Sequence, residues 1–188
     1  NGATLKVEAS AGDADIFVGD GLGNTANLFV TDSMVTQTVT GTSVYGRNAE
    51  FWVGGNGSTG VATFDNSTAN ISSAVGAADL FVGYNQSPSQ GGSSGTLPLE
   101  NGSTLSIAGQ TASFIAVGYY QGSGGAINVL SGSTLDQTAT FGSSNSVTLA
   151  IAGYAPTTTL LAPGESNVLV DGAGARLTTP GVGAIGGS

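Results

Sequence analysis

The chain has 188 residues, of which 32 are glycine, 39% are hydrophobic and only 8% are charged, and it contains neither cysteine nor histidine. Its formal net charge of −9 disfavours nucleic acids and anionic membrane surfaces as partners, because both carry negative charge themselves. The missing residue types exclude disulfides, thiolate or imidazole metal sites, cysteine nucleophiles and a Ser-His-Asp triad.

A Val-Gly element recurs along the chain and is the clearest sign of an internal repeat. Its copies read DIFVGDGLG, EFWVGGNGS, LFVGYNQS, FIAVGYYQGSG and LAIAGYAPT, in chain order. The anchoring glycines are Gly19, Gly54, Gly83, Gly118, Gly153 and Gly186, which gives spacings of 35, 29, 35, 35 and 33 residues. We therefore expect residues 1–188 to form a single domain of about 33-residue repeats.

Each unit contains two further strand-like runs. One begins with ANLFVTD at 26–32 and recurs at 60–66, 95–101, 126–132 and 166–172. The other directly follows the first and lies at 2–7, 33–39, 102–108, 132–138 and 174–179. These runs are rich in Val, Ile, Leu, Thr and Phe, and Gly, Ser, Asn or Asp separate them, a pattern typical of short β-strands.

No window of useful length shows the apolar spacing of an amphipathic helix, so the crossover helices of an α/β fold are not expected. Copies of each strand should instead stack in register from coil to coil. The sequence thus predicts an all-β fold, a parallel β-solenoid with three short strands per coil and about five to six coils. The longest apolar runs are far shorter than the roughly 20 residues that span a bilayer, so no membrane insertion of this segment is expected.

Two stretches carry a resemblance to a known family: VGYYQGSGGAINVLSGSTL at 117–135 and GESNVLVDGAGARLTTPGVGAIGGS at 164–188. The pattern resembles the β-strand repeats in passenger domains of bacterial autotransporters and related secreted surface proteins. The resemblance implies a right-handed β-helix, an extracellular or cell-surface location, and structural or adhesive roles.

Some segments depart from that pattern. SMVTQTV at 33–39 and STANISS at 67–73 replace the Gly-Ser-Thr-Leu run, and Pro98 lies inside a predicted strand, where it cannot donate a ladder hydrogen bond. The unit is cut at Asn1 and at Ser188, which suggests an excerpt of a longer protein or a subunit that stacks end to end.

Acidic residues recur at the corner after the first strand of the unit, and Ser131 replaces the acid in one copy. These residues are Asp32, Asp65, Glu100 and Asp171. One interpretation is a ladder of stacked carboxylates that binds calcium, which prefers oxygen ligands. The alternative is that Asp and Asn stand there because their side chains hydrogen-bond the backbone of turns. No other cofactor is expected, and no phosphate-binding loop, because the glycines recur with the repeat and no helix follows them.

The Val-Gly strand is apolar on both faces. Its central residues, Phe17, Trp52, Phe81, Ala116 and Ile151, should point outward if Val18, Val53, Val82 and Val117 point inward. A row of exposed aromatics marks an interface, so Phe17, Trp52, Phe81 and Ile151 are predicted to mediate self-association. The alternative is that a loop covers this face, or that the two faces are reversed. Tyr84, Tyr119 and Tyr154 should stack as a ladder, with glycan binding as a second interpretation.

The sequence offers few catalytic groups, and we expect no enzyme. Asp13 and Asp15 form the one close pair of acids that a polysaccharide-active solenoid could use. The favoured function is a structural or adhesive module, with specificity on the excursions at 84–95 and 154–165 and a glycan or host-surface ligand. The leading alternative is a subunit of an extracellular fibre, in which open solenoid ends or the aromatic face bind identical copies.

Overall fold

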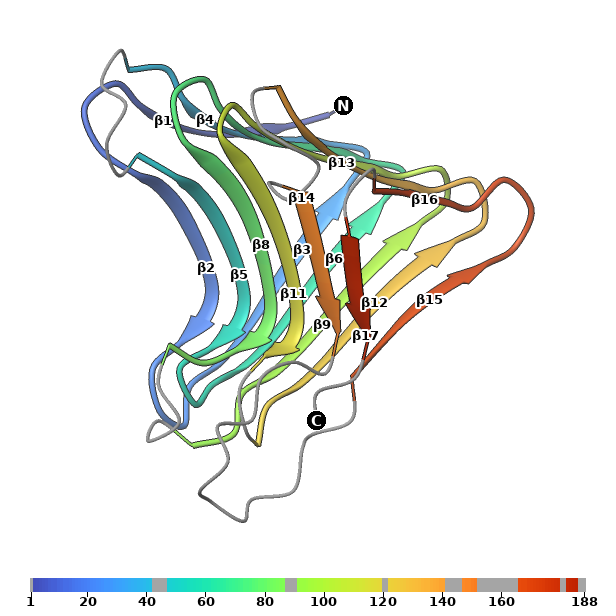
Figure 1. The fold of residues 1–188 in the computed structure, drawn as a ribbon. Coiled ribbons are helices and arrows are strands. Elements are labelled where there is room, and N and C mark those ends of the chain that lie inside the picture. The colour runs from blue at the N-terminus through green and yellow to red at the C-terminus, as the bar shows by residue number, and fades with distance from the viewer. Residues whose placement is uncertain are drawn as a thin grey trace.

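The computed structural model describes residues 2–41, 47–86, 91–119, 122–140, 147–151, 166–179 and 182–185. These residues form three parallel sheets, here named A, B and C, and the chain enters them in turn, so that each coil contributes one strand to each sheet (Figure 1). The predicted solenoid with three strands per coil is confirmed. No helix in this part of the chain is long and apolar enough to cross a membrane.

Each sheet consists of strands that stack in chain order. Sheet A contains β1 (Thr4–Ala9), β4 (Met34–Val39), β7 (Thr68–Ser73), β10 (Thr104–Gly109), β13 (Thr134–Ala139) and β16 (Arg176–Thr178). Sheet B contains β2 (Ala14–Asp20), β5 (Ala49–Gly55), β8 (Ala77–Tyr84), β11 (Ala112–Tyr119), β14 (Val147–Ile151) and β17 (Val182–Ile185). Sheet C contains β3 (Thr25–Thr31), β6 (Thr59–Asp65), β9 (Ser94–Glu100), β12 (Gly124–Leu130) and β15 (Ser166–Asp171).

The irregular segments fit this stacking. Residues 68–73 of the STANISS segment form β7, which pairs in unbroken register with β4 and with β10. Pro98 in β9 pairs opposite Asn128 of β12, but the ladder between β9 and β6 is interrupted opposite Leu97 and Pro98. The missing N–H of proline explains a gap on one side, since a central strand needs donors toward both neighbours.

The core is built from rows of apolar side chains, one from each coil, that point inward from all three sheets. Members of these rows include Val35, Leu105 and Leu135 in sheet A, Phe51, Leu80 and Ile115 in sheet B, and Phe64, Leu97 and Ile127 in sheet C. Their removal from water is the main term that favours the fold. The first coil is less covered: Leu5 is 45% exposed, whereas Val35, its partner in the next coil, is 1% exposed.

In the described part of the chain, the anchoring glycines Gly19, Gly54, Gly83 and Gly118 lie at the corner between sheets B and C. Gly54 and Gly83 have φ angles of +69° and +65°, which residues with a Cβ rarely adopt. A Cβ on either would also lie 1.9 Å from a backbone carbonyl oxygen, that of Ser94 or of Gly124. The Val-Gly element therefore recurs because this corner admits no side chain.

Serines fasten the corner between sheets C and A. The Ser67 Oγ donates to the Asp65 carbonyl oxygen at 2.7 Å and accepts from the Ser33 N–H at 3.1 Å. The Ser67 N–H in turn donates to the Ser103 Oγ at 3.1 Å. This ladder explains why serine recurs in the repeat, because each hydroxyl ties one coil to the next.

Two glutamines cross the interior and connect sheet A to sheet B. The Gln137 Nε2 donates to the carbonyl oxygens of Ser113 and Thr148, at 3.0 and 2.9 Å. Gln37 donates in the same way to the carbonyls of Ala14 and Glu50. Each amide thus bridges two successive strands of sheet B, while its own Oε1 is buried without a hydrogen-bond partner.

Candidate functional site

The outer face of sheet B carries two adjoining groups of side chains that set it apart from the other outer faces. The acid row consists of Asp15, Glu50 and Asp79, which lie in register on β2, β5 and β8. The aromatic cluster consists of Phe17, Trp52, Phe81, Tyr84, Phe114 and Tyr119. Side chains alternate along a strand, so residues between the inward rows must point outward.

The aromatic cluster is packed closely although it lies outside the core. Figure 1 shows the strands of sheet B bowed toward the interior, so that their outer face is concave. Outward side chains therefore converge, and Trp52 and Phe81 are only 2% and 7% exposed. Their ring centroids are 4.5 Å apart, and those of Phe81 and Tyr84 are 4.4 Å apart. Sheet B is consequently buried on both faces over its central strands.

The structure refines the predicted interface row. Phe17, Trp52 and Phe81 do point outward, but only Phe17, at 47%, is substantially exposed. Ile151 was assigned to the wrong face. It pairs with Val117 and packs against the inner core, because β14 follows β11 with an offset of 34 residues rather than the 35 taken from the glycines. A slip of one residue moves a side chain to the other face of a sheet.

The tyrosine ladder is confirmed for its first two members. The rings of Tyr84 and Tyr119 are stacked, with centroids 5.4 Å apart and an interplanar angle of 16°. Tyr154 lies outside the described residues. So do residues 87–90 of the first predicted specificity loop and all of the second, at 154–165. Glycan binding at these places stays a prediction.

The acid row has few hydrogen-bond donors. Glu50 is held by the Trp52 Nε1, which donates to its Oε2 at 3.0 Å, and by the Asn48 side-chain amide at 3.4 Å. The Asp79 Oδ1 accepts from the Phe114 N–H at 3.1 Å, and Asp79 is 8% exposed. The Asp15 Oδ1 is buried without a hydrogen-bond partner. Asp79 is thus buried and Asp15 and Glu50 are half-buried, with few hydrogen-bond donors to compensate the three carboxyl groups.

Burial and the charges of neighbouring acids raise the pKa values of two members of this row, Asp15 and Asp79. Burial raises the pKa of Asp79 to about 7, and the negative charge of Glu50 acts in the same direction. Burial likewise raises the pKa of Asp15 to about 6, with further contributions from Glu50 and Asp13. Within the described ranges the ion pair is that of Lys6 and Glu8 on sheet A, so no cation neutralises the row. Asp15 and Asp79 therefore exchange protons near neutral pH.

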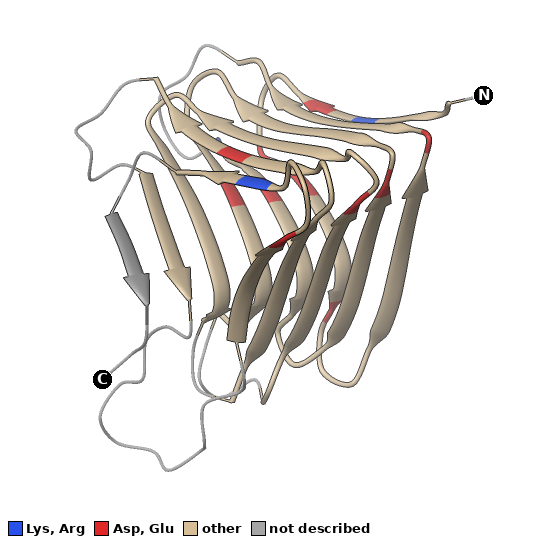
Figure 2. Ribbon diagram, turned by 90° about the vertical axis from the view of Figure 1, so that its right-hand side faces the viewer, with Lys and Arg blue, Asp and Glu red and all other residues tan. Residues whose placement is uncertain are grey.

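The corner acids do not form the predicted calcium ladder. Figure 2 shows acidic residues both at the corners beyond sheet C and within the strands of sheet B. At the corners, the Asn66 and Asn101 side-chain amides donate to the Oδ1 atoms of Asp32 and Asp65, at 2.6 Å in both cases. In the part of the chain that the structure describes, no three acidic side chains are placed to hold a metal ion.

The physical reason is a stagger of one residue between coils. Asp65 pairs with Thr31 and Glu100 in the β-ladder, whereas Asp32 occupies the next position, with φ +49°. Asn66 and Asn101 adopt the same left-handed conformation, at +46° and +51°. Asp32 thus takes the place of a turn asparagine, as the turn interpretation expects. Asp171 is exposed at the corresponding corner of β15.

The structure gives Asp13 and Asp15, the close pair of acids in the sequence, different surroundings. Asp13 precedes β2, and its Oδ1 accepts from the Asn48 N–H at 2.8 Å, which ties two coils together. Asp15 faces Glu50 instead. Sequence reasoning missed Glu50 and Asp79, although the repeat contains the signal: Asp15, Glu50 and Asp79 each precede an anchoring glycine by four residues.

Comparisons of the chain with protein-family models, with curated proteins and with solved structures found no match. The resemblance to autotransporter passenger repeats therefore stays a prediction from the sequence.

Proposed function

We propose that this chain is a non-catalytic structural or adhesive module of a secreted bacterial cell-surface or matrix protein. The observation that carries the proposal is the use of the corner side chains. Asp20, Asp32 and Asp65 each accept a hydrogen bond from an asparagine of the next coil, and Ser33, Ser67 and Ser103 connect successive coils. Polar groups that an enzyme would keep for substrate are used here to hold coils in register.

The outer face of sheet B supports the same proposal. The Trp52 and Phe81 rings are largely covered by other aromatic rings, and Asp79 is 8% exposed. Such a face adds a second layer of apolar packing, whereas a catalytic carboxyl group must reach a substrate. The bacterial and extracellular parts of the proposal rest on the sequence resemblance alone.

A second candidate function is a fibre subunit that stacks end to end. Leu5 of the first coil and Val170 of β15 are exposed, although the residues that pair with them, Val35 and Val129, are buried. Parallel strand edges beside exposed core side chains can accept another β-strand. An identical chain could pair with these strand edges, because each coil already stacks on a coil of similar shape.

Negative-stain electron microscopy of the purified chain distinguishes the two functions. A structural module gives isolated short particles at all concentrations, whereas a fibre subunit gives long filaments of uniform width. The variant Leu5→Lys introduces a charge at the end of the solenoid and should abolish filaments if stacking forms them. Val61→Lys, on the outer face of sheet C, is the matched control and should leave filaments intact.

Hydrolysis assays test the non-catalytic part of the proposal. We expect no release of reducing sugar from a panel of acidic and neutral polysaccharides. Activity that Asp15→Asn removes, and that the corner variant Asp171→Asn retains, would overturn the proposal and favour a polysaccharide-active enzyme.

A further inference from the structure

The acid row has an arrangement that hydrogen bonding within the fold does not explain. Asp15, Glu50 and Asp79 occupy the same position on three successive strands of sheet B, so their backbones lie one strand spacing apart, or about 4.8 Å along the stack, and all three side chains point outward. At that separation two ionised carboxylates repel each other, and a low dielectric constant strengthens the repulsion. Stacking the first three coils therefore brings like charges together.

The surroundings offer these charges little compensation. Asp15 faces Glu50 on β5 and lies close to Asp13, both of them acids. Asp79 faces Glu50 on one side, and on the other side it faces Phe114 of β11, which has no charge. Arg47 lies before β5, but its Nη1 donates to the Ser10 carbonyl oxygen. Among the described residues no metal-binding group of acids is present either.

We propose that the acid row is a proton-operated latch between the first three coils: a proton taken up from solvent is shared between carboxyl groups of neighbouring strands, which tightens the coils in mildly acidic solution. When the proton leaves, adjacent carboxylates repel, and the same coils loosen. A protonated carboxyl group donates one hydrogen bond, so the uptake supplies the donor that the row lacks. The latch is independent of the function proposed above, because it concerns the fold and not a ligand.

The direction of the pH dependence follows from proton linkage. Burial raises the pKa of Asp79 to about 7 and that of Asp15 to about 6, from an ordinary value of 3.8. The folded chain therefore binds more protons than the unfolded chain between about pH 4 and pH 7. The stability that these two groups contribute is fully present below this window and is lost as the pH rises through it. The two groups interact through Glu50, so the measured midpoints belong to the row as a whole.

The single tryptophan of the chain provides a local reporter. The Trp52 Nε1 donates to the Glu50 Oε2 at 3.0 Å, so its indole N–H resonance senses the charge of the row. In a pH series from 4 to 9, we expect the resonance in a 1H–15N correlation spectrum to move with a midpoint between about 6 and 7. The melting temperature should fall by about 5 °C between pH 5 and pH 8.

Asp79→Asn tests the latch directly, because asparagine keeps the Oδ1 that accepts from Phe114 and removes the charge. We expect its indole midpoint to fall by about 1 pH unit and its melting temperature at pH 8 to exceed that of the unchanged chain. Asp171→Asn, at an exposed corner, is the control and should reproduce both original pH profiles.

The proposal is overturned if the indole resonance does not titrate between pH 5 and pH 8, or if Asp79→Asn keeps the original midpoint. If Asp79→Asn does not fold, the indole titration of Glu50→Gln tests the latch instead. Removing the central charge should lower the pKa of both Asp15 and Asp79. Unchanged midpoints in folded Glu50→Gln would then overturn the latch.

Discussion

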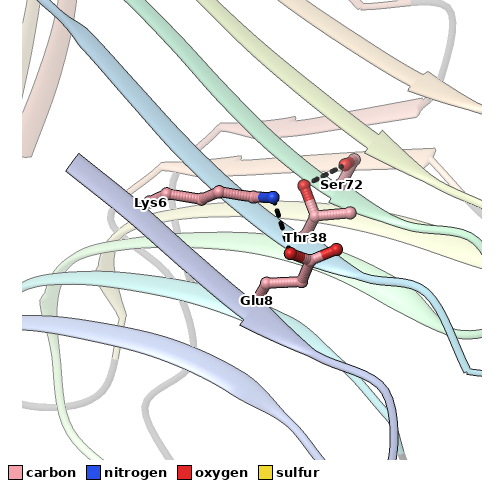
Figure 3. A network of polar contacts seen from close by, with 4 residues as sticks. All are labelled: Lys6, Glu8, Thr38 and Ser72. Atoms are coloured by element: carbon pink, nitrogen blue, oxygen red, sulfur yellow. Dashed lines mark hydrogen bonds and ion pairs between the residues drawn. The ribbon is translucent and has the colours of Figure 1, made fainter. Parts of the chain in front are cut away.

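The outer faces of sheets A and B differ sharply although their backbone ladders are alike. Sheet A presents small polar residues, including Thr36, Thr38, Asn70, Ser72 and Ser106. Figure 3 shows part of this face, where the Ser72 Oγ donates to the Thr38 Oγ1 at 3.4 Å and Lys6 pairs with Glu8. Sheet B instead presents aromatic rings and carboxyl groups, with Trp52 2% exposed.

The difference shows that the solenoid needs only its inner rows and corners to form. Val35 and Leu105 in sheet A are as deeply buried as Val53 and Leu80 in sheet B. Sheet A forms with an outer face of mainly threonine and serine, so the solenoid does not require apolar side chains there. The second apolar layer on sheet B therefore adds stability locally or serves a further purpose. Substitutions on the two faces should therefore have unequal effects.

The largest effect is expected for Trp52→Ala. This change empties the centre of the aromatic cluster and removes the hydrogen bond to Glu50, so the free energy of unfolding should decrease by about 3–5 kcal/mol. Chemical denaturation followed by far-ultraviolet circular dichroism measures the change, since the variant has no tryptophan fluorescence.

Ser106→Ala on sheet A is the matched control for Trp52→Ala, and it should change the free energy of unfolding by less than about 0.5 kcal/mol. Trp52→Phe keeps an aromatic ring in the cluster but loses the donor and part of the indole, so it should cost less than Trp52→Ala. Equal destabilisation by Trp52→Ala and Ser106→Ala would abolish the distinction between the two faces.

A smaller effect is expected where the two sheets are joined. Gln137→Met removes two hydrogen bonds to sheet B, each worth about 1 kcal/mol, but it also removes a buried Oε1 that has no partner. The net loss in the free energy of unfolding should be about 1–2 kcal/mol, measured by the same denaturation. Leu135→Met, two residues earlier on the same inner face, keeps the packing and should cost less. A neutral Gln137→Met would show that the glutamine does not connect the sheets energetically.

The sequence was sufficient to predict the stacked strands, because the anchoring glycines recur wherever the corner excludes a side chain. Gly54 and Gly83 mark that corner by their conformation and by the backbone oxygens close to them. The outward direction of Phe17, Trp52 and Phe81 followed from the alternation of side chains. The burial of Trp52 and Phe81 did not, since it depends on the curvature of sheet B, which no local residue pattern encodes.

The errors in the predicted sites arose where the repeat spacing did not give the register of the paired strands. Ile151 was misplaced because the distance between glycines exceeds the register offset by one residue. The corner acids were expected to stack because each unit has an acid near this corner, but Asp32 lies one position beyond the ladder position of Asp65. Glu50 and Asp79 occupy the repeat position four residues before the anchoring glycine. The acids at this position were overlooked because Asp and Glu alternate there and Phe114 replaces them in the next unit.

The smallest effect on stability is expected on sheet A, at the ion pair of Lys6 and Glu8. Their charged atoms are 2.6 Å apart, but the side chains are 59% and 46% exposed, so solvent screens the attraction. Lys6→Met should lower the free energy of unfolding by less than about 0.5 kcal/mol, and the difference should vanish in 1 M salt.

Lys6→Met should nevertheless change association, because Lys6 lies on β1, the edge strand of sheet A. A charged side chain on an edge strand opposes pairing with another chain, so its loss should increase the dimer fraction in sedimentation velocity. Glu8→Gln removes the same ion pair and keeps the lysine, and it should leave that fraction unchanged. If both variants associate equally, the ion pair rather than the edge lysine keeps the chains apart.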